Sequence, residues 1–207
     1  MSLVLYYAPG ACSGVTINAI EELGLECEYR KLDLSSGQQK TDAYLSINPH
    51  GKVPALITDG QLLTENPAIL IYLNSLVSDA KLLPPAGNEY QKMISYSDLM
   101  WLSSTLHPAV RHVCMPSHFT VNSDVKDVVE KAQSALKTYL DMTDKRLAKS
   151  NFWYGEQWTI FDIYLHWCYT RALRGGYSID GFPALLAHQK RVEIIPSFQQ
   201  RKVIENS

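Results

Sequence analysis

The chain has 207 residues, a formal net charge of −2 and a hydrophobic content of 46%. This is enough apolar material for one large domain or two small ones, and no long basic block points to a nucleic-acid partner. No apolar run approaches the roughly 18 residues of a membrane span, and the opening "MSLVLYYAPG" lacks the basic start of a secretory signal. Four cysteines lie far apart with no CxxC pair, which favours reduced thiols in a cytoplasmic protein over disulfides: Cys12, Cys27, Cys114 and Cys168.

The first 34 residues predict a strand, a helix and a second strand. Residues 3–8, "LVLYYA", form a short apolar and aromatic run that Pro9-Gly10 ends. Apolar residues then recur at helical spacing over 12–23, and Gly24 ends the pattern. Residues 27–34, "CEYRKLDL", alternate as a strand. Such a strand–helix–strand unit implies a parallel crossover.

A polar loop and a short helical piece ending at Asn48-Pro49 lead into a predicted hairpin. In "KVPALITDGQLLTE" (52–65), Asp59-Gly60 separates two apolar runs, and both turn residues tolerate positive φ. Asn66 then fits an N-cap with Pro67 at the first helical position of a further helix. The first eighty residues therefore predict the order β-α-β-α-β-β-α.

The second half predicts only helices. Residues 80–88, "AKLLPPAGN", form a Pro/Gly-rich linker, so we predict domains at 1–79 and 89–207. Helical periodicity covers 89–107 and 124–149, with Pro108 and Pro116 as interruptions. Thr159 and Asp162 have the spacing of a capping box, which predicts a helix start there and a structural role for both.

This α/β half followed by an all-helical bundle resembles the cytosolic glutathione transferases. The matching segments are "YYAPGACS" (6–13), "NPHGKVPAL" (48–56), "LLTENPAILIYL" (62–73) and "WTIFDIY" (158–164). "PGACS" is similar to the bacterial beta class, in which a cysteine replaces the tyrosine or serine of other classes. The resemblance implies a thioredoxin-like domain plus a helical domain, and a homodimer.

The chain also departs from related patterns. The maleylacetoacetate isomerase branch carries a serine-serine-cysteine motif followed by basic residues, which "GACSGVT" lacks. Beta-class proteins often have a lysine after the second strand, where this chain has Gly37 and the nearest lysine is Lys40. They also tend to have an asparagine that reaches across the dimer, and Met100 stands in its place here.

Glutathione carries two carboxylates and an ammonium, and three residues could hold its ends. Glu65 precedes a helix and could pair with the ammonium, while Asn66 and the helix N-terminus could hold a carboxylate. Plain N-capping explains the same two residues without a ligand. The family has a cis proline at the place of Pro54, which would turn the main chain of Val53 toward the tripeptide. The glutathione-binding set that the resemblance implies is Lys40, Lys52, Val53, Pro54, Glu65 and Asn66.

Cys12 stands where a predicted helix begins, and the helix dipole there would favour its thiolate. A lone cysteine is more often an inert, buried residue, and the family resemblance reverses that order. Ser13 could instead donate a hydrogen bond to the glutathione sulfur, and Tyr6 is a third candidate. His107 matches a histidine of the beta-class site, but a plain surface histidine near a helix end explains it equally well. The predicted catalytic set is thus Cys12, Ser13, His107 and Tyr6.

The helical half offers an acceptor pocket and a possible metal site. Trp101, Arg111 and Met115, with Phe119, could line a pocket for the second substrate, although helix packing alone explains them. The run "HPAVRHVCMPSH" (107–118) holds three histidines and a cysteine, but its prolines break regular ligand spacing. We therefore expect no metal.

These observations predict a glutathione transferase that conjugates the glutathione thiolate to small electrophiles in detoxification. Its co-substrate would be glutathione, and no nucleic acid or membrane would be a partner. One alternative is a thiol-disulfide oxidoreductase or peroxidase that works through a Cys12–glutathione disulfide. Another is a non-catalytic binding module of the same fold.

Overall fold

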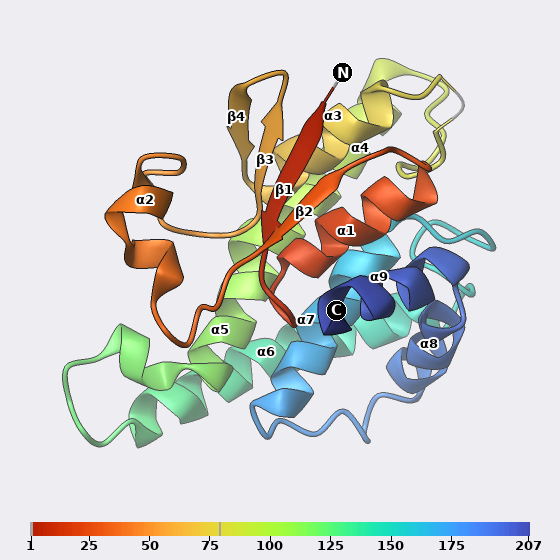
Figure 1. The fold of residues 1–207 in the computed structure, drawn as a ribbon. Helices are drawn as coiled ribbons and strands as arrows, with labels where there is room; N and C mark the ends of the chain where they lie inside the picture. Colours follow the sequence, from red (N-terminus) through yellow and green to blue (C-terminus); the bar gives the residue numbers. More distant parts are fainter. Residues whose placement is uncertain (1, 79) are drawn as a thin grey trace. The chain divides into compact units, whose positions relative to one another are not determined.

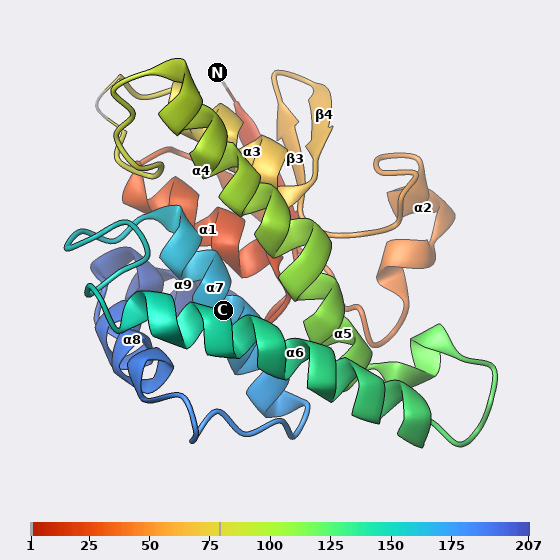
Figure 2. The same cartoon turned by 180° about the vertical axis from the view of Figure 1, so that it is seen from behind.

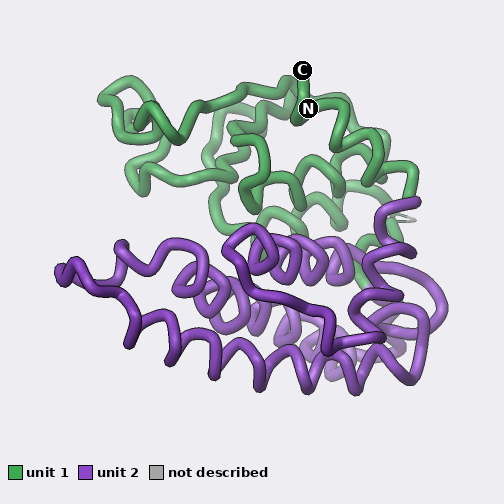
Figure 3. Tube along the Cα trace, turned by 90° about the horizontal axis from the view of Figure 1, so that it is seen from below, with its two compact units in different colours: residues 1–83, 195–207 green, residues 84–194 purple. Residues whose placement is uncertain are grey.

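A computed structural model describes residues 2–78 and 80–207. The chain forms two compact units, one made of residues 1–83 with 195–207 and the other of residues 84–194 (Figure 3). The sequence placed residues 195–207 in the helical domain, whereas the structure groups them with the first unit. The reason is that the last helix packs on the first one, as described below.

The first unit contains a four-stranded mixed sheet with helices around it (Figure 1). The strand order is β2-β1-β3-β4, in which β1 pairs parallel with β2 and antiparallel with β3. The predicted β-α-β-α-β-β-α order is therefore confirmed. Its elements are β1 (Leu3–Tyr7), α1 (Ser13–Glu22), β2 (Glu28–Lys31), the 3-10 turn η1 (Gln38–Lys40), α2 (Asp42–Leu45), β3 (Ala55–Thr58), β4 (Gln61–Thr64), α3 (Asn66–Ser75) and α9 (Pro196–Asn206).

Local sequence signals explain where several of these elements end. Gly24 has a φ of 62°, and the N–H groups of Gly24 and Leu25 bond back to Glu21 and Ile20, which closes α1 in a Schellman motif. Asp59 and Gly60 both have positive φ, at 46° and 82°, in the two-residue turn between β3 and β4. The predicted hairpin is thus confirmed.

The predicted N-cap of α3 was one residue late. Glu65 occupies the cap, and Asn66 is already the first residue of the helix, with Pro67 in its first turn. Asn66 has the right side chain for a cap, but that side chain bonds to another segment instead. A cap preference is a local signal, and here a long-range contact overrides it.

The two faces of the sheet are covered by different helices. Tyr6 packs with Tyr44 of α2 and Ala55 of β3 in a cluster on one face. Tyr7, the next residue, points to the opposite face because side chains alternate along a strand. Its hydroxyl donates to the carbonyl of Ile204 in α9 at 3.1 Å. Figure 1 shows α9 in dark blue beside α1 in red.

The second unit is helical, and Figure 2 shows its helices α5 and α6 side by side. Pro108 does not interrupt the helix as predicted. A π-helical turn precedes it, and Pro108 lies in the first turn of α5, where its missing N–H is not needed. The elements are α4 (Glu89–Trp101), the π turn η2 (Leu102–Leu106), α5 (His107–Cys114), the 3-10 turn η3 (Pro116–Phe119), α6 (Lys126–Leu147), α7 (Ile160–Arg174) and α8 (Pro183–Glu193).

The predicted capping box opens α7. The Asp162 carboxylate accepts from the main-chain N–H of Thr159 at 2.8 Å. It also accepts from the N–H of Trp153 at 2.8 Å and lies 3.0 Å from Nε2 of His188. Asp162 and His188 are both fully buried, so the carboxylate joins three segments in the core of this unit. Over the described residues, none of the helices is both long and apolar enough to cross a membrane.

Candidate functional site

Cys12 lies in the turn that carries the chain from the end of β1 into α1. It is the N-cap of α1 and is half-buried. Its Sγ lies 3.6 Å from the main-chain oxygen of Val53, in the segment that leads into β3. Cys12 is therefore placed at the carboxyl end of β1 beside a segment 41 residues away. The carboxyl ends of parallel strands are where α/β sheets bind ligands.

The segment beside Cys12 is held firmly by α2 and the loop after it. The Val53–Pro54 peptide is cis, as the resemblance implied. The main-chain oxygen of Lys52 accepts from the Tyr44 hydroxyl at 2.6 Å and from Nδ2 of Asn48 at 2.8 Å. The Val53 side chain packs on the Tyr6–Tyr44–Ala55 cluster. These contacts fix the main chain of Val53 opposite the Cys12 sulfur.

Asn66 connects this turn to α3. Its Nδ2 donates to the main-chain oxygen of Cys12 at 3.1 Å, and its Oδ1 accepts from the Thr16 hydroxyl at 2.8 Å. Asn66 is 4% exposed and Thr16 is fully buried. The side-chain amide that the sequence assigned to a glutathione carboxylate is thus engaged inside the protein. It joins the first turns of α1 and α3.

Glu65 has an unusual main-chain conformation. Its φ and ψ are 68° and 120°, and its side chain is exposed. A non-glycine residue in such a region costs roughly 1–3 kcal/mol, and such residues concentrate at functional sites. The strain leaves a carboxylate at the N-terminus of α3, next to the residue that contacts Cys12. The pairing of Glu65 with an ammonium group stays a prediction.

Ser13 and Tyr6, the other candidates for the sulfur contact, have partners elsewhere. The Ser13 hydroxyl accepts from the N–H of Ala8 at 3.1 Å and lies 3.3 Å from the oxygen of the same residue, and Ser13 is fully buried. The Tyr6 hydroxyl accepts from Nη1 of Arg30 at 2.7 Å on the far face of the sheet from α9. Ser13 therefore supports the turn that carries Cys12, whereas Tyr6 joins β1 to β2.

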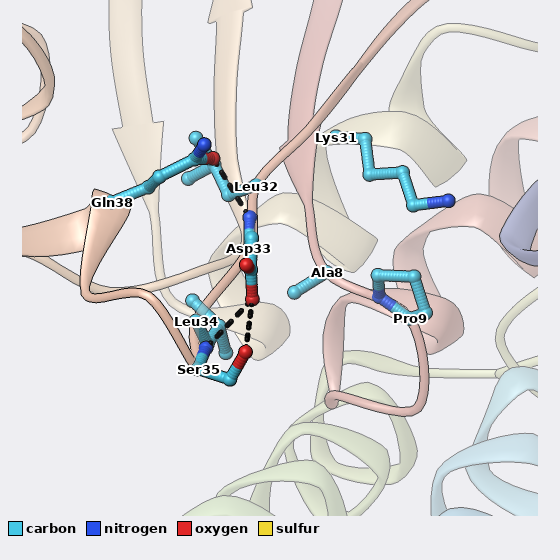
Figure 4. Close-up of a pocket in the computed structure, with 8 residues that line it drawn as sticks. All are labelled: Ala8, Pro9, Lys31, Leu32, Asp33, Leu34, Ser35 and Gln38. Carbon is cyan, nitrogen blue, oxygen red and sulfur yellow. Dashed lines mark hydrogen bonds between the residues drawn. The ribbon is translucent and has the colours of Figure 1, made fainter.

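A groove lies beside this turn, at the ends of β1 and β2 (Figure 4). Its volume is about 540 Å³. Ala8, Leu32 and other apolar groups line it, with the charged side chains of Lys31 and Asp33. Hydrogen bonds from Ser35 and Ser36 lower the pKa of the Asp33 carboxyl. The full lining is Ala8, Pro9, Lys31, Leu32, Asp33, Leu34, Ser35 and Gln38.

The predicted lysines are exposed on either side of Gly51. Lys40 ends the turn η1, and its Nζ would lie 3.0 Å from a Cβ added at Gly51. Lys52 is exposed and offers its main-chain oxygen to α2. Both side chains can reach an anion near this segment, and their contact with glutathione stays a prediction.

The remaining predicted site residues lie in the second unit. His107 Nδ1 is 2.9 Å from the Tyr164 hydroxyl, and its ring packs on Trp167. Trp101 stacks on Trp153. The Arg111 guanidinium lies over the ring of Phe119, and Met115 is half-buried. These contacts account for packing, so the acceptor pocket formed by Trp101, Arg111 and Met115 stays a prediction.

The absence of a metal stays a prediction. Among the described residues, no group of three or more His, Cys, Asp and Glu side chains could hold a metal ion. In the histidine-rich run, a ring nitrogen of His112 lies 2.6 Å from the oxygen of Pro108, and its ring stacks on Phe119.

Sequence reasoning missed the residues that hold the site together. Thr16, Tyr44 and Asn48 all fix main-chain atoms or side chains next to Cys12 and Val53. A polar residue such as Thr16 inside a short helix between apolar positions was a usable signal, because a buried hydroxyl needs a partner.

Four features together define a thioredoxin-like domain. They are the parallel β1–β2 pair, the antiparallel β3–β4 hairpin, the cysteine at the start of α1 and the cis proline before β3. An all-helical unit follows this domain in the chain. Residues 1–75 match the model of the glutathione S-transferase N-terminal domain. The chain is 29% identical over 201 residues to glutathione S-transferase GstA of Escherichia coli O157:H7, with 94% of each chain covered.

Two solved structures extend this match over the whole chain. The beta class glutathione S-transferase of Sphingomonas chungbukensis is 32% identical, with a TM-score of 0.84 and 98% of each chain covered. A sphingomonad glutathione S-transferase complexed with glutathione is 31% identical, with the same TM-score and coverage. This chain belongs to the cytosolic glutathione transferase family.

Proposed function

We propose that this glutathione transferase binds glutathione at the Cys12 turn and conjugates its thiolate to small electrophilic molecules. The observation that carries the proposal is the convergence on Cys12. The oxygen of Val53 faces its sulfur, and Asn66 holds its main chain at the start of α3. Three separate segments therefore meet at one residue, Cys12, which a scaffold without a ligand does not require.

Each end of glutathione has a partner in this arrangement. The Glu65 carboxylate receives the ammonium, and the N-terminal N–H groups of α3 receive the neighbouring carboxylate. The main chain of Val53 pairs with the cysteinyl unit, which leaves the glutathione sulfur beside Cys12. The lysines Lys40 and Lys52 receive the remaining carboxylate. Holding both reactants removes much of the entropy cost of their meeting, and the start of α1 favours a thiolate.

Conjugation of an aromatic halide, measured with wild type, Cys12→Ala and Tyr6→Phe, tests these roles. We expect Cys12→Ala to lose at least about tenfold in kcat/KM, since one well-placed polar contact in a transition state is worth that much or more. Tyr6→Phe is the matched control, because its hydroxyl faces Arg30, and we expect its turnover to stay within about twofold. Undiminished turnover in Cys12→Ala would reject the role assigned to Cys12.

A second reaction is favoured by the half-buried position of Cys12 itself. The Cys12 thiolate would attack the glutathione sulfur of a mixed disulfide between glutathione and a substrate thiol, form a Cys12–glutathione disulfide and release the substrate thiolate. A free glutathione thiolate would then attack the Cys12–glutathione disulfide, which restores the Cys12 thiolate and forms glutathione disulfide, so the substrate is reduced and glutathione is oxidised. A mass increase of one glutathione on the oxidised protein, lost in Cys12→Ala, would establish this route. An unchanged mass would exclude it.

We further propose a homodimer of the bacterial beta class, a cytoplasmic location and a role in detoxification. All four cysteines are thiols outside any disulfide, which suits a reducing compartment. The dimer is supported by α4, on which four large apolar side chains are 42–75% exposed. These residues are Tyr90, Met93, Ile94 and Met100.

Light scattering on the purified protein tests the dimer. We expect Met93→Glu with Ile94→Glu to give a monomer, because two charges would be buried in the interface. The control is Met142→Glu on α6, whose methionine is equally exposed at 49%. A monomeric wild type, or a dimer unaffected by the α4 changes, would contradict the proposal.

A further inference from the structure

The last turn of α9 contacts the turn that carries Cys12. The N–H of Gly10 donates to Oε1 of Glu205 at 3.0 Å, across 195 residues of sequence. One position earlier on α9, the oxygen of Ile204 accepts from the Tyr7 hydroxyl at 3.1 Å. Tyr7 ends β1, so both contacts fall on the same five-residue stretch before Cys12. Figure 1 shows the end of α9 next to the start of α1.

The Glu205 side chain is itself held in place. Its Oε2 lies 3.5 Å from Nε of Arg201, one helical turn earlier, and the two side chains are 13% and 10% exposed. The guanidinium of Arg201 lies 4.1 Å over the ring of Phe198. A carboxylate that is this well buried, paired and oriented is a strong acceptor for a main-chain N–H.

Gly14 allows this close approach. A Cβ added at Gly14 would lie 2.9 Å from Oε1 of Glu205 and 3.3 Å from Cδ of Arg201. The carboxylate therefore rests on the first turn of α1, two residues after Cys12. On the other side of the turn, Nζ of Lys31 donates to the main-chain oxygen of Ser207 at 2.8 Å. The end of α9 thus contacts β1, β2 and the start of α1.

The turn needs such support from outside. Gly10 has a φ of 71°, and local hydrogen bonds join Ala8, Ala11, Ser13 and Gly14 to one another. Those local bonds move with the turn as a unit. Asn66 of α3 holds the Cys12 end of the turn, and Glu205 holds the Gly10 end. The bond to Glu205 ties the turn to another helix, and it does so two residues before the reactive sulfur.

We propose that Glu205 is a positioning residue, which holds the Gly10 turn so that Cys12 stays at the Val53 main chain. This inference rests on the proposed function of Cys12. Glu205 acts through Gly10 and touches neither substrate. Loss of its carboxylate lets the turn move, which misplaces the thiol without removing any glutathione contact at Glu65 or Val53.

Two variants and a control separate this role from general support of the fold. Glu205→Ala removes the acceptor, whereas Glu205→Gln keeps an amide oxygen that can accept from Gly10. Asn206→Ala changes the exposed neighbour on the same turn of α9. Amide hydrogen exchange of Gly10, measured by NMR on the labelled protein, needs no glutathione and reports the turn directly.

We expect the exchange of the Gly10 amide to accelerate at least about tenfold in Glu205→Ala, since a hydrogen bond to a charged group is worth that factor or more. It should stay within about threefold of wild type in Glu205→Gln and unchanged in Asn206→Ala. In conjugation assays, kcat should fall about tenfold in Glu205→Ala while KM for glutathione stays within about twofold, and Glu205→Gln should restore most of kcat.

Unchanged exchange of the Gly10 amide in Glu205→Ala would overturn the proposal. A loss of kcat that also occurs in Asn206→Ala would overturn it too, and so would a loss of kcat in Glu205→Ala that is equally large in Glu205→Gln. A wild-type protein without transferase turnover would instead refute the proposed function. In that case the exchange of the Gly10 amide alone decides whether Glu205 positions the turn.

Discussion

Replacing Asn66 by alanine would cut the link between the first turns of α1 and α3. Asn66 is 4% exposed and makes two hydrogen bonds, to the Thr16 hydroxyl and to the main-chain oxygen of Cys12. Alanine leaves both partners in a buried place, and it opens the space of an amide group. The change therefore tests whether this side chain works as an internal connector.

The expected loss follows from what the partners can do without Asn66. Two buried hydrogen bonds contribute about 1 kcal/mol each, and an unsatisfied buried group adds about 1–3 kcal/mol. Thr16 follows Cys12 by four residues on α1, so its freed hydroxyl can rotate and donate to the Cys12 oxygen. This rescue satisfies both orphaned groups. We expect a loss of about 2 kcal/mol, or a melting temperature about 4–8 °C lower for a chain of this size.

Thermal and urea unfolding of Asn66→Ala, Thr16→Val and the double variant measure this loss and its origin. The free-energy losses of the two single variants, added together, should exceed the loss of the double variant by at least about 0.5 kcal/mol. The reason is that each single variant removes the same Thr16–Asn66 hydrogen bond. The exposed Asn122→Ala is the control and should unfold like wild type. A loss under about 0.5 kcal/mol for Asn66→Ala, or simple additivity, would refute the connector.

Four further predictions concern the core, two glycines, the reactivity of the thiols and the pH dependence of stability. Asp162→Ala should lower the free energy of unfolding by at least about 3 kcal/mol, because the N–H groups of Trp153 and Thr159 and the ring of His188 lose their shared partner. A loss under about 1 kcal/mol in urea unfolding would contradict this prediction. Gly51→Ala should lower the free energy of unfolding by well over the roughly 1–3 kcal/mol of its positive φ, since a Cβ there would lie 2.8 Å from the main-chain oxygen of Gln39. In Gly60→Ala the new Cβ meets nothing within 4 Å, so this variant should lose only the free energy of the backbone strain. Equal melting temperatures of the two variants would disprove the distinction. Burial raises the pKa of Cys27 to about 12 and also raises the pKa of Cys114, and Cys168 is fully buried. Iodoacetamide at pH 8 should therefore label Cys12 before the other three cysteines, as measured by peptide mapping. Comparable labelling of Cys27 would contradict this prediction. Because the unfolded thiol of Cys27 ionises near 9 and the folded one near 12, its contribution to stability is complete below pH 9 and declines as the pH rises from 9 to 12, a slope that Cys27→Ala should reduce.

The elements that could be predicted from the sequence are those that local chemistry decides. Asp59-Gly60 supplies two positive φ values in sequence, so the hairpin has one solution. Gly24 ends α1 for the same reason, and Asp162 lies three residues after Thr159, where a capping box places it. In each case the deciding atoms are within five residues of one another.

The predictions that failed, or that the structure modifies, involve competition with distant groups. Asn66 has the chemistry of an N-cap, but a hydroxyl and a carbonyl of α1 claim its side chain, so the cap moves to Glu65. Pro108 lacks an N–H, but a π turn before it lets the helix continue. The same holds for the candidate site. The position of Cys12 at a helix start can be predicted from the sequence, whereas its contacts with the distant residues Val53 and Asn66 cannot.

The assignment of the last helix shows why. The buried residues of α9 are Ser197, Phe198 and Arg201, and only one of the three is apolar. Apolar periodicity therefore does not reveal this buried face, nor which part of the chain covers it. The missing information lay on α1, whose residues from 13 to 20 are all buried although only half of them are apolar. Each small or polar residue there meets a side chain or main-chain group from another segment. Ser13 meets Ala8, Gly14 meets Glu205, Thr16 meets Asn66 and Asn18 meets Ser197. A helix buried on every side needs covering from more than its own sheet, and the returning C-terminal segment provides it.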